Sequence, residues 1–497
     1  MTENDDRTIT DLICVNGLDA HLGETINKPI SLTSLGREIG KRISLQLKPT
    51  LHMSRIAMVE KQNPFNLDLT YTKNFGYTKN FGTIPGIKEL LVPQFSNLIE
   101  EKIDIFEEKP KGWGIVFPDG VDPAYVEVFK PLVSHRGGDI YYYKPGTHAF
   151  EWESTACPEG EMPPPFLLLV GSAEEIPFYF QNELDISYSV GRVIFSSPEN
   201  ASRYVAVVLE HETGTFTKKS RNICFFSPSF DLPTIQSQKY LCERIVESFS
   251  NVPNFNVTYF KSTDATKVNF LKEVVEKKKD ERQDFLMVAT HGCASNDSEI
   301  QEQVQGAWLF QDKELLEGRT ICPGIFSPFD VEADADISQA IIFSFACYTG
   351  GTLKNSIYNN CIPESLLKEG LLKYQGRKDF VGNLPVSLLN AKNPCLGIIA
   401  HVDPVWNTFL GKNNYTPYRK MVQEILQGTP VGEALNYLNS RSAVLSVQLI
   451  NSINEQLTRG EPIDNKKLAD IWLHILDAQY YTFFGDPFIS LRPLACQ

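Results

Sequence analysis

The sequence lacks an excess of basic residues, and it lacks any long hydrophobic run. Lysine and arginine total 47 against 61 aspartate and glutamate residues, which gives a net charge of −14 and an isoelectric point near 5.2. Because phosphate binding needs clustered positive charge, this balance excludes a broad surface for nucleic acids or anionic membranes. The longest apolar runs, 166–170 and 340–347, are much shorter than the roughly 20 residues that span a bilayer. We therefore expect neither a nucleic-acid partner nor a membrane partner.

Closely spaced pairs of cysteines are also lacking. Ten cysteines are scattered along 497 residues without a C-x-x-C pair. This usage fits a reducing cytoplasm and argues against both a disulfide framework and a zinc ribbon. The first residues, Met1–Asp6, are acidic and no apolar stretch follows them, which argues against a secretory signal. We expect a cytoplasmic protein whose 42% apolar content supports a large core.

The patterning of the chain divides it into three regions. Residues 1–110 mix short apolar patches with polar stretches and are expected to form an N-terminal accessory or regulatory region. Beyond a connector at Pro163–Pro165, short apolar runs alternate with amphipathic segments of helical length. We expect a first α/β subdomain at 111–260 and a catalytic subdomain at 261–497.

This alternation predicts an α/β fold with a mostly parallel sheet flanked by helices on both faces. In such sheets, catalytic residues gather at the carboxyl ends of the strands. The residues that follow each apolar run are therefore the first candidates for a site. Strands are predicted at 166–170, 257–260, 285–289, 341–345 and 395–400. Helices are predicted at 201–212, 238–249, 265–278, 363–373, 418–427, 431–453 and 466–480.

Two of the predicted strands end in residues with nucleophilic chemistry. The strand at 285–289 runs into His291 and Gly292, and the strand at 341–345 runs into Cys347. A cysteine nucleophile needs a base to supply its thiolate, and a histidine within hydrogen-bond reach provides one. A glycine beside such residues lets backbone N–H groups approach a substrate carbonyl and form an oxyanion hole.

A structural interpretation of the same residues stays open. Buried cysteines are common, and a single histidine after a strand is more often structural than catalytic. Two such residues at the ends of separate strands in one predicted sheet favour a catalytic pair.

The order of these residues resembles that of the clan CD cysteine peptidases, which include caspases, gingipains and CHAT proteases. A His-Gly pair is followed 56 residues later by Ala346 and Cys347, close to the caspase spacing of about 50. The chain departs from the caspase pattern at Phe345, and from the gingipain-like and CHAT-like pattern at Ser172, where an aspartate is usual. Further similar segments, in the family's order within 112–492, are 166–177, 190–192, 398–406, 428–434 and 484–487.

The resemblance implies a caspase-like fold and an active cysteine endopeptidase. Cys347 would be the nucleophile and His291 the general base and acid. The backbone amides of Gly292 and Cys347 would bind the oxyanion. Protein or peptide substrates would be hydrolysed through an acyl-enzyme, with no metal or other cofactor. Gln305, after the histidine loop, is expected to lie near the wall of the substrate cleft.

Substrate specificity is predicted from Asp185. Its Asp-x-x-Tyr context resembles that of the acidic residue at the base of the primary specificity pocket in arginine-directed gingipains. A carboxylate there would pair with a guanidinium through two hydrogen bonds, so cleavage after Arg is expected, with Lys weaker. Two alternatives stay open, namely that Glu183 is the acid or that Asp185 caps a turn.

Other functional interpretations also stay open. One alternative is a non-catalytic, caspase-like sensor or scaffold module.

His401, Asp403 and Asp486 are expected to be structural. The resemblance further suggests a signal-gated protease, with a role in bacterial antiviral defence and a nucleotide-derived small molecule as activator. A homo-oligomer is a further alternative.

Overall fold

The structure is a computed structural model of the chain. Most of the predicted accessory region 1–110 lies outside the residues that the structure describes, as do residues 363–370 of the helix predicted at 363–373. The described residues are 12–20, 23–26, 28–32, 35–37, 112–158, 161–214, 218–277, 281–312, 324–331, 337, 340–358, 371–408, 414–459 and 464–494.

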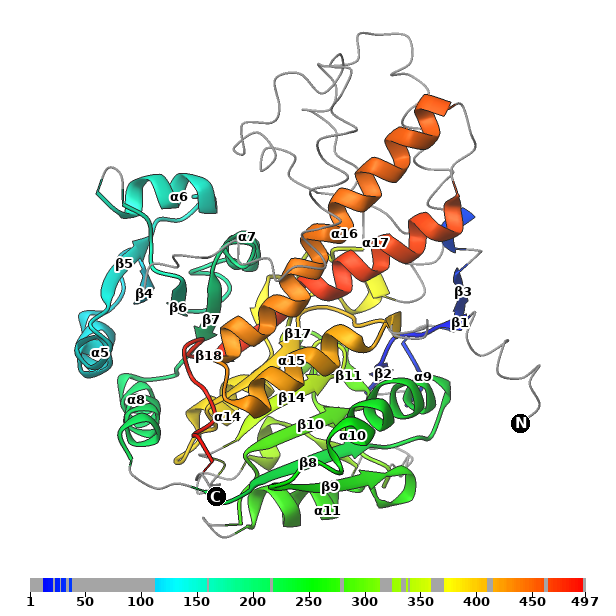
Figure 1. Ribbon diagram of the computed structural model, residues 1–497, viewed down its shortest axis with the longest axis horizontal. Coiled ribbons are helices and arrows are strands. Elements are labelled where there is room, and N and C mark those ends of the chain that lie inside the picture. The colour runs from blue at the N-terminus through cyan, green and yellow to red at the C-terminus, as the bar shows by residue number, and fades with distance from the viewer. Residues whose placement is uncertain are drawn as a thin grey trace.

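A ten-stranded sheet runs through the molecule (Figure 1). All neighbouring strands are parallel except β17 and β18, so the two halves of the sheet run in opposite directions. From one edge to the other the order is β5 (Asp139–Tyr143), β4 (Trp113–Pro118), β6 (Phe166–Val170), β7 (Ser189–Val193), β18 (Tyr481–Gly485), β17 (Gly397–His401), β14 (Ile341–Phe345), β10 (Phe285–Ala289), β8 (Arg221–Ser227) and β9 (Phe255–Lys261).

Burial explains why these segments form strands. Every residue of β6, β10 and β14 is buried, as expected for parallel strands that are covered on both faces. The edge strand β9 alternates between half-buried and exposed residues, because it has a neighbour on one side only. The predicted α/β class with a mostly parallel sheet is confirmed.

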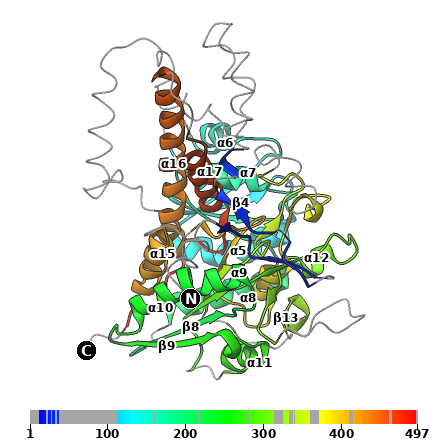
Figure 2. The same cartoon turned by 90° about the vertical axis from the view of Figure 1, so that its right-hand side faces the viewer.

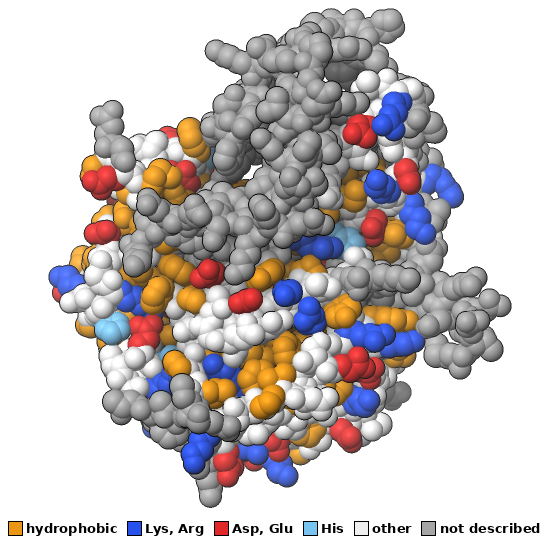
Figure 3. All heavy atoms as spheres, viewed as in Figure 1, with side chains coloured by type: hydrophobic (Ala, Val, Ile, Leu, Met, Phe, Trp, Pro, Cys, Tyr) orange, Lys and Arg blue, Asp and Glu red, His pale blue; other side chains and the backbone are white. Residues whose placement is uncertain are grey.

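Helices cover both faces of the sheet. Figures 1 and 2 show α10, α15 and α16 on one side and α11 on the other. Within the described ranges, none of the helices combines the length and the apolarity that crossing a membrane requires. Acidic and basic side chains are interspersed over the described part of the face in Figure 3. The helices are α5 (Pro123–Arg136), α6 (Ala149–Ala156), α7 (Phe178–Leu184), α8 (Pro198–Thr213), α9 (Leu232–Gln236), α10 (Glu243–Phe249), α11 (Lys267–Phe270), α12 (Gln301–Val304), α14 (Asn383–Asn390), α15 (Thr416–Gln427), α16 (Val431–Arg459) and α17 (Asn465–Gln479), and η2 (Ser237–Cys242) continues α9.

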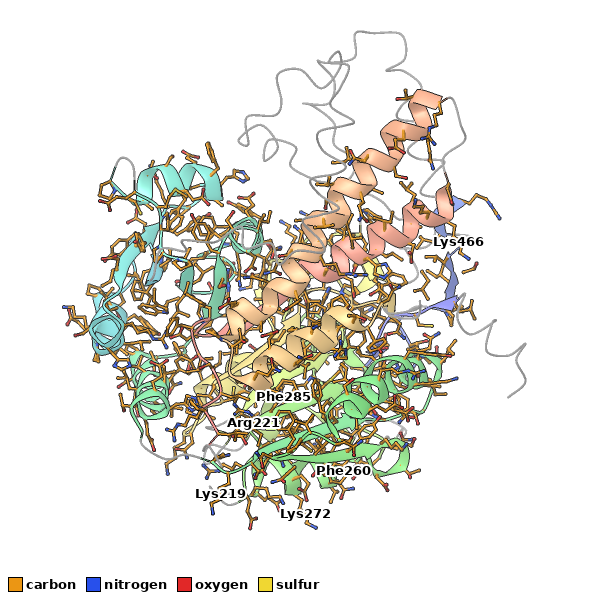
Figure 4. All side chains as sticks on the ribbon, in the orientation of Figure 1. Lys219, Arg221, Phe260, Lys272, Phe285 and Lys466 are labelled. Atoms are coloured by element: carbon orange, nitrogen blue, oxygen red, sulfur yellow. The ribbon has the colours of Figure 1, made fainter. Side chains whose placement is uncertain are left out.

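The N-terminal strands lie at the carboxyl ends of β10 and β14. In Figure 4, Arg221 and Phe285 mark the amino ends of β8 and β10, and the strands β1 (Leu12–Ile13) and β3 (Ile30–Ser31) lie toward the opposite ends. Between them, β2 (Gly17–Asp19) joins a small sheet of order β13-β12-β11-β2. This small sheet also contains β11 (Gly292–Ala294), β12 (Trp308–Leu309) and β13 (Ile325–Phe326).

The strand order places parts of the predicted first subdomain and of the predicted accessory region beside strands of the predicted catalytic subdomain. β8 and β9 belong by sequence to the predicted first subdomain, yet they lie beside β10 at the far end of the sheet. Part of the predicted accessory region pairs with β11, directly after His291. The segment that contains β2 is therefore built into the small sheet that starts directly after His291.

Candidate active site

The register of two central strands brings His291 and Cys347 to the same level. β10 and β14 are parallel neighbours, with Ala289 paired to Phe345. His291 and Cys347 each lie two residues beyond that pair. Adjacent strands are about 4.8 Å apart, so the two residues lie next to each other at the carboxyl end of the sheet. The sequence predicted both positions, and the structure brings them together.

Gly292 lies directly against the backbone of Cys347. A β-carbon added at Gly292 would lie 1.8 Å from the carbonyl oxygen of Cys347 and 2.9 Å from its nitrogen. Both atoms belong to the backbone and cannot rotate away, so no other residue fits there. The sequence predicted this glycine, and its close approach explains why the position needs one.

The two predicted oxyanion donors converge on one oxygen. The backbone N–H of Gly292 donates to the carbonyl oxygen of Asn16 at 2.8 Å, and the N–H of Cys347 donates to the same oxygen at 3.0 Å. Two N–H groups that share one carbonyl oxygen beside a thiol form the donor arrangement of an oxyanion hole.

Asp231 orients the His291 ring. Its Oδ2 lies 2.6 Å from His291 Nε2, which leaves the buried Nδ1 without a hydrogen-bond partner. Asp231 also caps α9, where it exchanges hydrogen bonds with Thr234. Burial acts to raise the pKa of the Asp231 carboxyl, but His291 and Thr234 outweigh it and lower that pKa. A carboxylate at this position fixes the tautomer of the imidazole and stabilises its protonated form.

Asp231 was not among the residues predicted from the sequence. It follows β8, the strand beside β10, by four residues. Two features of the sequence point to this position. Asp231 followed three positions later by Thr234 is a helix-capping pattern, and the strand before it, β8, is an apolar run. The decisive fact is that β8 lies next to β10, and sequence patterning alone does not order the strands.

The thiol of Cys347 is enclosed. The residue is 0% exposed, and its Sγ accepts a hydrogen bond from the Val405 N–H at 3.2 Å. Burial raises the pKa of the Cys347 thiol well above its ordinary value, and the nearby carboxyls of Asp477 and Asp403 act in the same direction. In this arrangement the cysteine is a thiol rather than a thiolate.

The backbone next to Cys347 adopts two strained conformations. Tyr348 has a φ of 59° and Asp403 a φ of 74°. Both values lie in the left-handed region of the backbone, which residues other than glycine adopt uncommonly. The Tyr348 N–H donates to the Asp403 carbonyl at 3.0 Å, so a backbone hydrogen bond connects the two strained residues. Strain of this kind costs about 1–3 kcal/mol per residue and is found mainly at functional sites.

Gln305 connects the histidine loop to the chain after Cys347. Its Nε2 donates to Thr352 Oγ1 at 2.8 Å and to the Tyr374 carbonyl at 2.9 Å. Its Oε1 accepts the Ser295 N–H at 3.1 Å, and the residue is 1% exposed. These contacts give Gln305 a positioning role, and direct contact with a substrate stays a prediction.

Asp185 lies apart from His291 and Cys347. It follows the last residue of α7 and is 4% exposed, and its neighbour Leu184 belongs to an apolar cluster of the first half of the sheet. Burial raises the pKa of its carboxyl well above the ordinary value, and the Arg192 guanidinium opposes that rise. β18 and β17 separate β7, the strand after Asp185, from β14. Its predicted alternative, Glu183, accepts hydrogen bonds from the Ala149 N–H and from His148.

The residues expected to be structural have internal partners. His401 Nδ1 lies 3.1 Å from the Asp403 carbonyl oxygen, and burial lowers the pKa of His401 to about 4. The Asp403 carboxylate accepts from Ser356, and burial raises its pKa to about 7. Asp486 accepts from the Trp113 indole and the Phe488 N–H. Among the described residues, no group of three or more His, Cys, Asp or Glu side chains could hold a metal ion.

Comparison with known proteins gives two similar solved structures. No protein-family model matches the chain, and no curated protein matches it. One structure is a complex of the Porphyromonas gingivalis RgpB pro- and mature domains, 14% identical, with a TM-score of 0.42 over 77% of this chain and 80% of that one. The other is described as a protease, 10% identical, with a TM-score of 0.45 over 78% of this chain and 79% of that one.

Proposed function

We propose that the protein is a cysteine endopeptidase that hydrolyses peptide bonds through an acyl-enzyme on Cys347. One observation carries the proposal. The N–H groups of Gly292 and Cys347 both donate to a single peptide carbonyl oxygen, next to the thiol and level with His291. The site therefore already binds a peptide carbonyl in the way that acyl transfer requires.

The reaction uses groups that the chain itself supplies. His291 takes the thiol proton, and Sγ of Cys347 adds to the substrate carbonyl carbon. The two N–H donors hold the oxyanion, and Asp231 stabilises the imidazolium. The C–N bond then breaks, and His291 gives its proton to the departing amine. Water, deprotonated by His291, hydrolyses the thioester and restores the thiol.

Backbone pairing around the thiol supports a polypeptide as the substrate. The N–H of Asn16 donates to the Val405 carbonyl at 3.2 Å, and the N–H of Asn407 donates to the Cys14 carbonyl at 2.9 Å. The edge at 405–407 therefore pairs with an extended chain, which is a common way of binding peptides. The bound chain continues on both sides of the carbonyl, as an endopeptidase requires.

The finer specificity stays a prediction. Preference for Arg over Lys depends on Asp185, and it requires the buried Asp185 carboxyl, whose oxygens have no hydrogen-bond partner within the described residues, to pair with a substrate guanidinium. Gating by a signal, activation by a nucleotide-derived molecule and a role in antiviral defence also stay predictions. Calorimetry of the full chain with cyclic nucleotides tests the activator directly.

A peptide-library profile tests the proposed function. The wild-type chain should create new peptide termini, whereas Cys347→Ala should create none and His291→Ala nearly none, since nucleophile and base act as a unit. Cys293→Ala is a matched control, because Cys293 is also buried and follows His291 by two residues. Cleavage that persists in Cys347→Ala, or that is lost in Cys293→Ala alone, would contradict the proposal.

A further inference from the structure

The peptide carbonyl in the oxyanion hole belongs to the chain itself. Residues 12–19, here called the cleft segment, pass through the site next to Cys347 and His291. We propose that the cleft segment is an internal substrate that is cut between Asn16 and Gly17, and that the pocket around the Asn16 side chain is the primary specificity pocket, selective for a carboxamide. This inference rests on the proposed endopeptidase function.

On the amino side of the bond, the cleft segment is held as a substrate would be. Val15 forms an antiparallel bridge with Trp406, between the two hydrogen bonds that Cys14 and Asn16 make with the 405–407 edge. The residues before the bond are therefore paired with this edge by a bridge at Val15 and by hydrogen bonds of Cys14 and Asn16 on either side of it. Asn16 occupies the position of the residue whose carbonyl is attacked.

On the carboxyl side of the bond, the cleft segment continues past the thiol. β2 pairs with β11 in parallel, with Gly17 opposite Gly292. A β-carbon added at Gly17 would lie 3.2 Å from Sγ of Cys347 and 2.4 Å from Cδ1 of Ile26. The thiol thus lies beside the α-carbon of Gly17 while the oxyanion hole holds the carbonyl oxygen of Asn16, so the bond between these residues is the one presented for attack.

The pocket around the Asn16 side chain is polar and uncharged. Asn16 is 0% exposed, and its Nδ2 donates to Ser237 Oγ at 2.5 Å. Ser237 gives its own proton to the Pro233 carbonyl at 2.8 Å, so its lone pairs face Asn16. Asn407 Nδ2 donates to the same carbonyl at 3.1 Å and to Gln236 Oε1 at 2.9 Å, which fixes the pocket wall.

This hydrogen-bond direction predicts a preference. An asparagine side chain offers the N–H that Ser237 accepts. An aspartate would place a carboxylate charge at a fully buried position, where the named contacts include no cation to pair with it, and Ser237 would have to turn its proton away from Pro233 to donate to it. A site built to bind a donor rejects an analogue that lacks it, because the buried partner is left unpaired. The pocket contacts named above include no carboxylate that could pair with a guanidinium or an ammonium. We therefore expect cleavage after Asn to exceed cleavage after Asp, Arg or Lys.

The cleavage itself follows the proposed chemistry. Sγ of Cys347 bonds to the carbonyl carbon of Asn16, the bond to the Gly17 nitrogen breaks, and His291 delivers the former thiol proton to that nitrogen. Water then releases residues 1–16 with a carboxylate at Asn16. Cys347 is fully enclosed in this arrangement, and the same burial raises the pKa of its thiol, so we expect this cleavage to be slow. Until the cleft segment leaves, its carbonyl excludes other substrates.

Intact-mass measurement and N-terminal sequencing of the full chain test the inference. The wild-type chain should lose residues 1–16 on prolonged incubation and begin at Gly17, while Cys347→Ala stays whole. Asn16→Asp should slow this cleavage by about 10²-fold. The matched control Glu24→Gln, an exposed change near the same segment, should be cleaved like the wild type.

Two further measurements make the result decisive even if Asn16→Asp folds poorly. Peptides that differ only at the cleaved position should show kcat/KM for Asn at least about 10²-fold above Asp and Arg. Gly17→Val, whose side chain would collide with Ile26, should expel the cleft segment and speed alkylation of Cys347.

The outcomes separate this inference from the proposed function. Cys347-dependent cleavage of library peptides after Arg, with the bond after Asn16 left whole, would overturn the inference and leave the endopeptidase standing. Absence of any cleavage in both the wild type and Gly17→Val would overturn both. Release of residues 1–16 from Cys347→Ala at the wild-type rate would assign the cut to another protease and overturn the inference.

Discussion

Replacing Asp231 by asparagine should slow catalysis without unfolding the chain. Asp231 accepts from His291 Nε2 at 2.6 Å, and its side chain is 25% exposed. A hydrogen bond to a charged group contributes about 1.5–3 kcal/mol. At about 1.4 kcal/mol per factor of ten, the loss corresponds to a fall in kcat of roughly 10- to 150-fold. Partial exposure favours the lower end of that range.

The change should fall on kcat and leave KM nearly constant, because Asp231 contacts the histidine rather than the substrate. Asparagine caps a helix as well as aspartate does, so α9 should stay folded. Asp122→Asn is the matched control, since Asp122 caps α5 by accepting the Ala124 N–H and lies on the far half of the sheet. That variant should keep wild-type kcat and stability.

The assay is peptide cleavage under saturating substrate, with urea unfolding measured alongside. Because the pKa of Asp231 is lowered in the folded chain, the stability that its hydrogen bonds to His291 and Thr234 contribute is present above the ordinary aspartate range and is lost as the pH falls through the lowered value. The wild type and Asp231→Asn should therefore converge in stability in acid. An unchanged kcat in Asp231→Asn would refute the assignment of Asp231 to the catalytic machinery.

Three further predictions concern other residues. Gly292→Ala should abolish cleavage and alkylation of Cys347, since its β-carbon would lie 1.8 Å from a carbonyl oxygen; wild-type activity in that variant would refute the oxyanion hole. Asp403→Asn should remove a pH dependence of the free energy of unfolding, measured in urea. Burial raises the pKa of Asp403 to about 7, so the stability that protonated Asp403 contributes is full below the ordinary pKa near 4. That stability is lost as the pH rises through 7, by up to about 4 kcal/mol. Stability curves that stay parallel from pH 4 to 8 would contradict this account of Asp403. Asp185→Asn tests the Arg preference, which requires a fall of at least about 10²-fold in kcat/KM for Arg peptides; a change in stability alone would give Asp185 a structural role only.

The predictions that succeeded depend on local hydrophobicity. The strands at 166–170, 285–289 and 341–345 have the predicted bounds, because each is a continuous apolar run that the sheet buries on both faces. The predicted pair His291 and Cys347 follows from the general rule that reactive residues gather at the carboxyl ends of such strands.

The features that were missed depend on contacts between distant segments. Asp231 reaches His291 only because β8 lies beside β10, and the order of strands is a property of the whole sheet. The strand Gly17–Asp19 is too short to show any periodicity, and its partner Gly292 lies 275 residues further along the chain. No local pattern marks Asn16 as the residue whose carbonyl enters the oxyanion hole.

The central claim is that Cys347, activated by His291, hydrolyses peptide bonds. The most direct measurement is mass spectrometry of a complex peptide library incubated with the wild-type chain, with Gly17→Val, and with each of these carrying Cys347→Ala. We expect new termini from both chains that retain Cys347, more of them from Gly17→Val, and none from either chain that lacks the thiol. Equal numbers of new termini with and without Cys347, or none from any of the four chains, would contradict it.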